Sequence, residues 1–313
     1  MNCQTMRLQR RGQSIRVRLW AAPQPTSNGH RKVLIVHGMG EHSARYGAVA
    51  AALNAANITV AALDLRGHGQ SLPKDASVGD MGYQGWTECL RDIHRLQRWL
   101  DANYDGATIL LGHSMGATLA QQYLYLHSAD LAGVVLSGPV GAMPAATWLA
   151  FESIARFDAW RIHPGADSPL LSKRIFAANN RAFEKPGEDA GDGFAWLSRD
   201  PDQVAAYVAD PLCGGVIKAD NLADMFAASR RAVAPENLLC IRDGFPMYVL
   251  WGSADPVSQG GGATRLIKIY TNAGLDVAQK CYVDGRHEMF NEINRETTIA
   301  DLIRWLEQAR FTL

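Results

Sequence analysis

Residues 112–116 read Gly-His-Ser-Met-Gly. It follows an apolar run at 107–111 and opens an amphipathic run at 117–127. A strand, a sharp turn with a serine at its apex and a helix are typical of a nucleophile elbow. The strained turn requires near-absent side chains on both sides of the serine, which the two glycines provide. The pentapeptide alone is only moderately specific, and the flanking patterns are what indicate a nucleophilic Ser114.

An aspartate and a histidine follow Ser114 at comparable places in the chain. Residues 248–252 predict a buried strand that is followed by Asp255, and residues 278–283 predict a strand that is followed by His287. Ligand and catalytic groups of open parallel sheets collect at the carboxyl ends of the strands. The order serine, acid, histidine is the order of this type of active site.

The chemistry assigns one role to each side chain. A serine hydroxyl needs a base to become a nucleophile, and a histidine can accept its proton and return it to the leaving group. A buried carboxylate fixes the imidazole tautomer. We therefore predict Ser114 as nucleophile, His287 as general acid and base, and Asp255 as the orienting acid. The alternative acid is Asp284, whose spacing of three residues from His287 suits a local turn contact better.

Two backbone N–H groups are predicted to bind the oxyanion that develops in acyl transfer. One belongs to the residue after the nucleophile, Met115, and the other comes from the loop after an earlier strand. Residues 32–36 predict that strand and residues 37–40, His-Gly-Met-Gly, its loop, so we expect Met39 to be the second donor. A plain glycine turn is the alternative interpretation of this loop.

The bulk composition limits the partners. Lys plus Arg and Asp plus Glu both number 31, so a zero net charge gives no electrostatic case for nucleic acid or an anionic membrane. No apolar run reaches the length of a membrane span. Residues 1–18 lack the apolar core of a secretory signal and predict a hairpin with Gly12 at its turn, with an Arg-rich transit peptide as the alternative. No obligate protein partner is evident.

The cysteine and histidine patterns argue against metal and disulfide chemistry. Five cysteines, an odd number without a C-x-x-C pair, predict reduced thiols in a cytoplasmic protein. The nine histidines show neither H-x-x-H nor H-E-x-x-H spacing. We therefore expect no metal and no cofactor.

Strand and helix patterns alternate in the first half of the chain and resume after residue 245. This alternation predicts an α/β fold with a mostly parallel central sheet and helices on both faces. Between them, repeated prolines separate short helical patterns. We predict a core of residues 1–138 and 245–313, and an inserted helical cap (lid) of residues 139–244 over the catalytic edge. An extra subdomain without substrate contact is the alternative.

Other residues near these motifs have structural interpretations. Trp148, Phe151 and Phe157 recur at helical spacing, which favours packing of the cap, with a lipid-touching lip as the alternative. We expect His113 to be packed or hydrogen bonded, and His42 and Glu41 to order the oxyanion loop rather than take part in catalysis.

Taken together, the motifs resemble the monoacylglycerol lipase and lysophospholipase branch of the α/β-hydrolases. The resemblance spans residues 33–306 and rests on the runs at 37–46, 64–71, 112–116, 252–255 and 285–288, with weaker support at 196–201 and 210–213. It implies a serine ester hydrolase that cleaves single-chain lipid esters such as monoacylglycerols or lysophospholipids. It also leaves open a transient contact between the cap and a membrane surface, and hence a peripheral location there.

Three other functions remain open. A short-chain carboxylesterase or thioesterase would use the same triad. An iminopeptidase-like amide hydrolase would need cap carboxylates to hold a free amine, and the candidates are Glu152, Glu184, Glu188 and Asp189. A non-catalytic ligand sensor would be expected to have a damaged triad or oxyanion loop, whereas both sets of residues are present.

Overall fold

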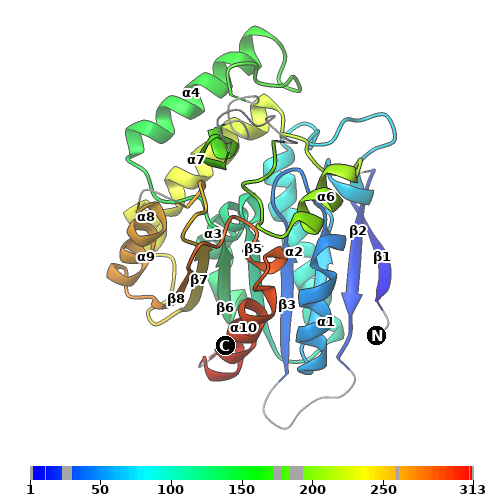
Figure 1. Ribbon diagram of the computed structural model, residues 1–313, viewed down its shortest axis with the longest axis vertical. Coiled ribbons are helices and arrows are strands. Elements are labelled where there is room, and N and C mark those ends of the chain that lie inside the picture. The colour runs from blue at the N-terminus through cyan, green and yellow to red at the C-terminus, as the bar shows by residue number, and fades with distance from the viewer. Residues whose placement is uncertain are drawn as a thin grey trace.

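A single sheet of eight strands organises the computed structural model, which describes residues 3–10, 12–22, 30–171, 178–183, 193–258, 261–309 and 311 (Figure 1). Its order is β1-β2-β4-β3-β5-β6-β7-β8. The strands are β1 (Gln4–Arg10), β2 (Gln13–Trp20), β3 (Arg31–Val36), β4 (Thr59–Leu63), β5 (Ala107–His113), β6 (Gly133–Ser137), β7 (Pro246–Gly252) and β8 (Asp276–Tyr282). β2 pairs antiparallel with β1 and β4, and every other pair is parallel. The predicted mostly parallel sheet is confirmed, as is the hairpin at Gly12, where φ is 77°.

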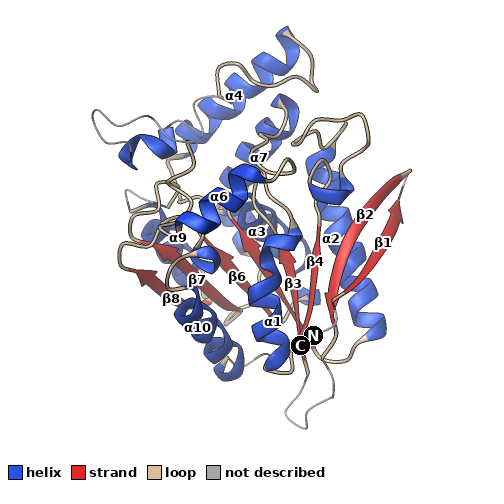
Figure 2. Ribbon diagram, turned by 45° about the vertical axis from the view of Figure 1, so that its right-hand side comes forward, coloured by secondary structure: helices blue, strands red, loops and turns tan. Residues whose placement is uncertain are grey.

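Helices cover both faces of the sheet (Figure 2). The helices are α1 (Gly47–Ala55), α2 (Gly85–Asn103), α3 (Met115–His127), α4 (Ala145–Arg161), α6 (Pro201–Ala209), α7 (Ala219–Ala232), α8 (Pro235–Leu238), α9 (Gly262–Asn272) and α10 (Arg295–Gln308). Alternate residues of β3 show the two layers. Val33 and Ile35 join the apolar cluster that α1 and α10 cover, whereas Leu34 and Val36 join the cluster under α2, α3 and α9. Burial on both faces explains why the parallel strands are continuous apolar runs.

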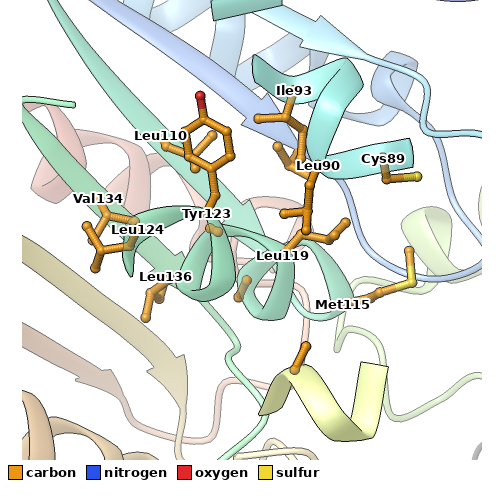
Figure 3. Packing of buried hydrophobic residues seen from close by; sticks show 14 of the residues in the cluster. Cys89, Leu90, Ile93, Leu110, Met115, Leu119, Tyr123, Leu124, Val134 and Leu136 are labelled. Carbon is orange, nitrogen blue, oxygen red and sulfur yellow. The ribbon is translucent and has the colours of Figure 1, made fainter. Parts of the chain in front are cut away.

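Helix α3 is anchored to the sheet by fully buried side chains. Figure 3 shows Leu119, Tyr123 and Leu124 of this helix packed with Leu110 of β5 and Val134 of β6. All five are 0% exposed. Because α3 begins one residue after the turn at residue 114, this packing fixes the geometry of that turn.

Helices α4, α6 and α7 lie above the carboxyl edge of the sheet (Figure 1). The aromatic side chains that recur along α4 differ in their exposure. Trp148 is 2% exposed and packs with Phe151 against Phe226 of α7, while Phe157 is 48% exposed. Trp148 and Phe226 belong to the same apolar cluster as the residues under α3. The division between a core and a cap at residues 139–244 stays a prediction, since the two share this cluster.

Hydrogen bonds to a buried carboxylate fix the segment just before the last helix. α10 starts at Arg295, and Glu292 stands before it with a fully buried side chain. The Glu292 carboxylate accepts the backbone N–H groups of Arg199 and Arg286 at 3.1 and 3.0 Å. These contacts hold Glu292 outside the helix and join the segment around residue 199 to the loop before α10.

Candidate active site

Ser114 occupies the turn between β5 and α3 in a strained backbone conformation. Its φ is 53° and its ψ is −117°, a region that residues other than glycine rarely adopt. A Cβ atom on Gly112 would lie 2.3 Å from the carbonyl oxygen of Gly116, and one on Gly116 would lie 2.2 Å from that of Val36. Only glycine fits at both positions, so the sequence Gly-His-Ser-Met-Gly is what this tight crossing of strand and helix requires.

Asp255 and His287 are brought into direct contact at the same edge of the sheet. The Nδ1–H group of His287 donates to Asp255 Oδ1 at 3.0 Å, and both side chains are buried. The Asp255 carboxylate also accepts the N–H of Val257 at 2.9 Å and the hydroxyl of Ser258 at 2.8 Å. The alternative acid, Asp284, is exposed and lies in a turn where its own N–H donates to a serine hydroxyl. The geometry therefore pairs Asp255, not Asp284, with His287.

Burial and charge act in opposite directions on this pair. Burial alone lowers the pKa of His287, but the carboxylate of Asp255 reverses this effect and the pKa is raised. Burial raises the pKa of Asp255, and the contact with His287 lowers it below its ordinary value. The pair therefore favours an ionised carboxylate beside an imidazole that accepts a proton readily.

The second ring nitrogen of His287 is available for chemistry. Nε2 is buried and has no hydrogen-bond partner among the described residues. His287 and Ser114 line one cavity of about 90 Å³, together with Gly38, Met39 and Met115. Met115 is the first residue of α3, where backbone N–H groups have no partner within the helix. The structure thus gathers four of the predicted site residues around one small space, and the fifth, Asp255, is bound to His287.

The remaining walls of this cavity differ in character. The apolar lining residues include Val140, Leu197, Met225 and Val257, and the polar ones include Glu41, Asn179, Tyr207 and Glu288. Such a lining suits a ligand with an apolar part and a polar part.

His113 and Trp196 pack around the imidazole of His287. Their ring centroids lie 4.7 and 5.0 Å from it. His113 is buried and its Nδ1 lies 3.1 Å from the carbonyl oxygen of Ser137, in agreement with the structural role expected for it. Burial and the neighbouring His287 lower the pKa of His113, so it stays neutral beside the pair.

Residues 196–198 belong to the predicted cap. Their backbone carbonyl groups hold the loop at residues 285–288, which carries His287 and is called the histidine loop below. The N–H of His287 donates to Trp196 O at 3.3 Å, and the N–H of Glu288 donates to Leu197 O at 2.8 Å. The guanidinium of Arg286 donates to Ser198 O at 3.0 Å. Sequence reasoning singled out this segment only through its resemblance, because nothing in its residue types indicates where it docks.

The predicted oxyanion loop, residues 37–40, is followed by the buried carboxylate of Glu41. The sequence predicted that Glu41 orders this loop but not which groups it binds. Glu41 Oε1 accepts the N–H of Gly38 at 2.6 Å and the hydroxyl of Tyr46 at 2.8 Å, so it orders the loop as expected. His42 Nε2 lies 2.8 Å from Asp210 Oδ2 and joins this loop to the predicted cap. The sequence analysis missed Arg45, although its spacing of four residues from Glu41 was a signal for an ion pair.

Two clusters of described residues have enough donor atoms close together to hold a metal ion. They are His42, Asp210 and Cys213, and His94, His127 and Asp130. Neither cluster lines the cavity at Ser114. In the first, the imidazole and the carboxylate already bind each other.

Comparison with known proteins indicates which family this chain belongs to. The family model described as "Serine aminopeptidase, S33" matches residues 27–294. A monoacylglycerol lipase of Mycolicibacterium smegmatis is 30% identical over 285 residues, which cover 90% of each chain. The monoglyceride lipase of Homo sapiens is 27% identical over 307 residues, which cover 96% of this chain and 89% of that protein.

Among solved structures, a highly thermostable carboxyl esterase from Bacillus coagulans superposes with a TM-score of 0.86. The match covers 98% of both chains at 26% sequence identity. Fold, chain coverage and sequence agree that this protein is an ester hydrolase. The chain belongs to the serine aminopeptidase S33 family of α/β-hydrolases, in the branch of the monoacylglycerol lipases.

Proposed function

We propose that this protein cleaves carboxylic esters of single-chain lipids through an acyl-serine intermediate. Ser114 Oγ attacks the ester carbonyl while His287 Nε2 takes its proton, and the N–H groups of Met39 and Met115 stabilise the oxyanion. His287 then gives the proton to the leaving alcohol. Water attacks the acyl-serine with His287 again as base, which releases the acid and restores the serine. Asp255 keeps the imidazole in the required tautomer.

One observation carries this proposal. The imidazole of His287 is bound to Asp255 through Nδ1, and its buried Nε2 has no other described partner while the residue shares a cavity with Ser114. His68 Nε2 is also buried without a described partner, but His68 does not line this cavity, so the space shared with Ser114 is what distinguishes His287.

The relatives and the cavity together support the substrate class. Two relatives are named for the cleavage of monoacylglycerols, whose single acyl chain and polar glycerol suit a lining that holds both apolar and polar side chains. The cavity measures only about 90 Å³, whereas pockets for drug-sized ligands measure about 300–1,000 Å³. A long acyl chain therefore requires the segments above the sheet to move apart when it binds.

We expect kcat/KM for a long-chain monoacylglycerol to exceed that for a short-chain monoacylglycerol by at least about tenfold. The physical reason is that each buried methylene contributes about 0.8 kcal/mol. The measurement compares matched monoacylglycerols, lysophospholipids and nitrophenyl esters of increasing chain length below their aggregation limits. Hydrolysis of short esters alone would assign the protein to the general carboxylesterases or thioesterases.

An aminopeptidase activity, which the name of the family suggests, has less support at this site. A free amine needs an unpaired carboxylate, but Glu41 and Glu288 in the cavity wall are both ion-paired with Arg45. Glu152 pairs with two arginines and does not line the cavity. The other three candidate carboxylates of the sequence analysis, at positions 184, 188 and 189, lie outside the described residues.

We also propose that α4 makes a transient contact with lipid surfaces. Trp160 is 81% exposed at the end of this helix, and Phe157 lies beside it with a centroid distance of 5.9 Å. Leu149, Ile162 and Leu170 add exposed apolar side chains on α4 and just after it. Aromatic side chains of this kind are favoured at the boundary between membrane and water. Among the described residues, no helix combines the length and apolar character needed to cross a bilayer.

Replacing both Phe157 and Trp160 with serine is expected to lower binding to phosphatidylcholine vesicles by about tenfold or more, because their apolar burial is lost. Vesicle sedimentation measures the partition. Leu239→Ser is the matched control, since Leu239 is 86% exposed but follows α8 rather than α4. Equal binding of the double variant and the wild type would exclude α4 as the contact.

A further inference from the structure

Arg45 touches three parts of the site at once. Its Nη1 donates to Glu41 Oε2 at 3.0 Å, and its Nη2 donates to Glu288 Oε2 at 2.6 Å. A further bond from Nη1 to Glu288 makes the second contact bidentate. The guanidinium also lies over the ring of Tyr207 on α6, 4.9 Å from its centroid. Arg45 is only 11% exposed, and both glutamates are buried.

One end of this network reaches the oxyanion loop. Glu41 accepts the N–H of Gly38, which immediately precedes Met39. Burial raises the pKa of Glu41, but Arg45, His113 and the bond from Gly38 outweigh burial and bring this pKa to about 2. The ionised carboxylate therefore fixes the peptide beside the proposed oxyanion donor only while Arg45 balances its charge.

The other end reaches the histidine loop. Glu288 is the residue after His287, and its carboxylate also accepts the side-chain amide of Asn291 at 3.0 Å. Glu41 and Glu288 approach the same guanidinium from loops that are more than 240 residues apart in the chain. Without that cation the two buried carboxylates would repel each other, and an unpaired buried charge is strongly destabilising.

We infer that Arg45 is a positioning residue. Its single contact with Glu41 and its bidentate contact with Glu288 hold the oxyanion loop and the histidine loop in a fixed position relative to each other. This inference rests on the proposed function, because it assigns Arg45 a role through Met39 and His287. Correct placement of the reacting groups matters, since a displacement of about 1 Å can lower the rate about 100-fold. Lysine cannot replace it fully, because an ammonium lacks the planar fork that reaches both carboxylates.

The charges around His287 link the role of Arg45 to the pH dependence of activity. Asp255, Glu288 and Glu41 face the imidazole and raise its pKa, while burial lowers it and His113 packs against it. Arg45 compensates two of these carboxylates. Loss of the Arg45 charge changes both the field at the imidazole and the ionisation of the two buried glutamates that raise the pKa of His287. Because activity requires the neutral imidazole, the acid limb of kcat/KM moves.

The test compares Arg45→Met with Arg45→Lys on a soluble short-chain ester. We expect Arg45→Met to lower kcat by about 10- to 100-fold, to change KM little, and to move the acid limb. Arg45→Lys should keep the acid limb of the wild type and recover only part of kcat. If Arg45→Met does not fold, the partial loss of kcat in Arg45→Lys carries the test.

The matched control is Arg66→Met. Arg66 is another buried arginine with two carboxylate partners, Asp92 and Glu88, and it does not line the cavity. It should lose thermal stability without a shift of the acid limb. Unchanged kcat and acid limb in the Arg45 variants, or the same changes in Arg66→Met, would overturn the inference. Turnover retained by Ser114→Ala would instead overturn the proposed function, whatever the Arg45 variants do.

Discussion

Ser114→Ala is expected to lower kcat/KM for every ester substrate by about a millionfold, as for the loss of a serine nucleophile in other hydrolases. Covalent labelling by a fluorophosphonate should disappear with it. The free energy of unfolding should change by less than about 1 kcal/mol, because alanine and serine bear the same cost at a φ of 53°. Initial rates, probe labelling and a thermal melt of the same preparation measure the three quantities.

Ser153→Ala is the control for this variant, since Ser153 is exposed on α4 and should keep wild-type rates and labelling. Substantial turnover by Ser114→Ala would exclude the acyl-serine mechanism. Lipid binding by the wild type without turnover or labelling would favour the ligand-sensor alternative.

Asp255→Asn is expected to lower kcat by about 10,000-fold, because the amide leaves His287 in the wrong tautomer. The carboxylate of Asp255 raises the pKa of His287, so its removal lowers that pKa. Activity depends on the neutral imidazole, and the acid limb of the residual kcat/KM should therefore move to lower pH than in the wild type. A pH–rate profile of both proteins on one soluble ester measures the change.

Asp284→Asn is the matched control and decides between the two acids. Asp284 is exposed with a φ of 57°, a conformation that asparagine tolerates well. We expect its kcat and its acid limb to equal those of the wild type. A loss in Asp284→Asn comparable to that in Asp255→Asn would remove Asp255 from its proposed role.

Local rules explain why much of the fold could be predicted from the sequence. The turn at Ser114 admits only glycine two residues to either side, so its geometry is visible in the sequence as Gly-His-Ser-Met-Gly. Strands buried on both faces are continuous apolar runs, which made β3, β5 and β6 readable. The placement of Asp255 and His287 followed because parallel strands bring their carboxyl ends to one edge.

The residue pattern thus predicts the mostly parallel sheet, the turn at Ser114 and the residues that reach the carboxyl edge of the sheet. What surrounds these residues depends on tertiary contacts. The fork of Arg45 on Glu288 and the bond from His287 to the carbonyl of Trp196 join segments far apart in the chain. The exposure of Phe157 on an otherwise packed stripe is equally invisible in its spacing. Such contacts depend on how long loops dock over a finished sheet, and no local periodicity encodes that docking.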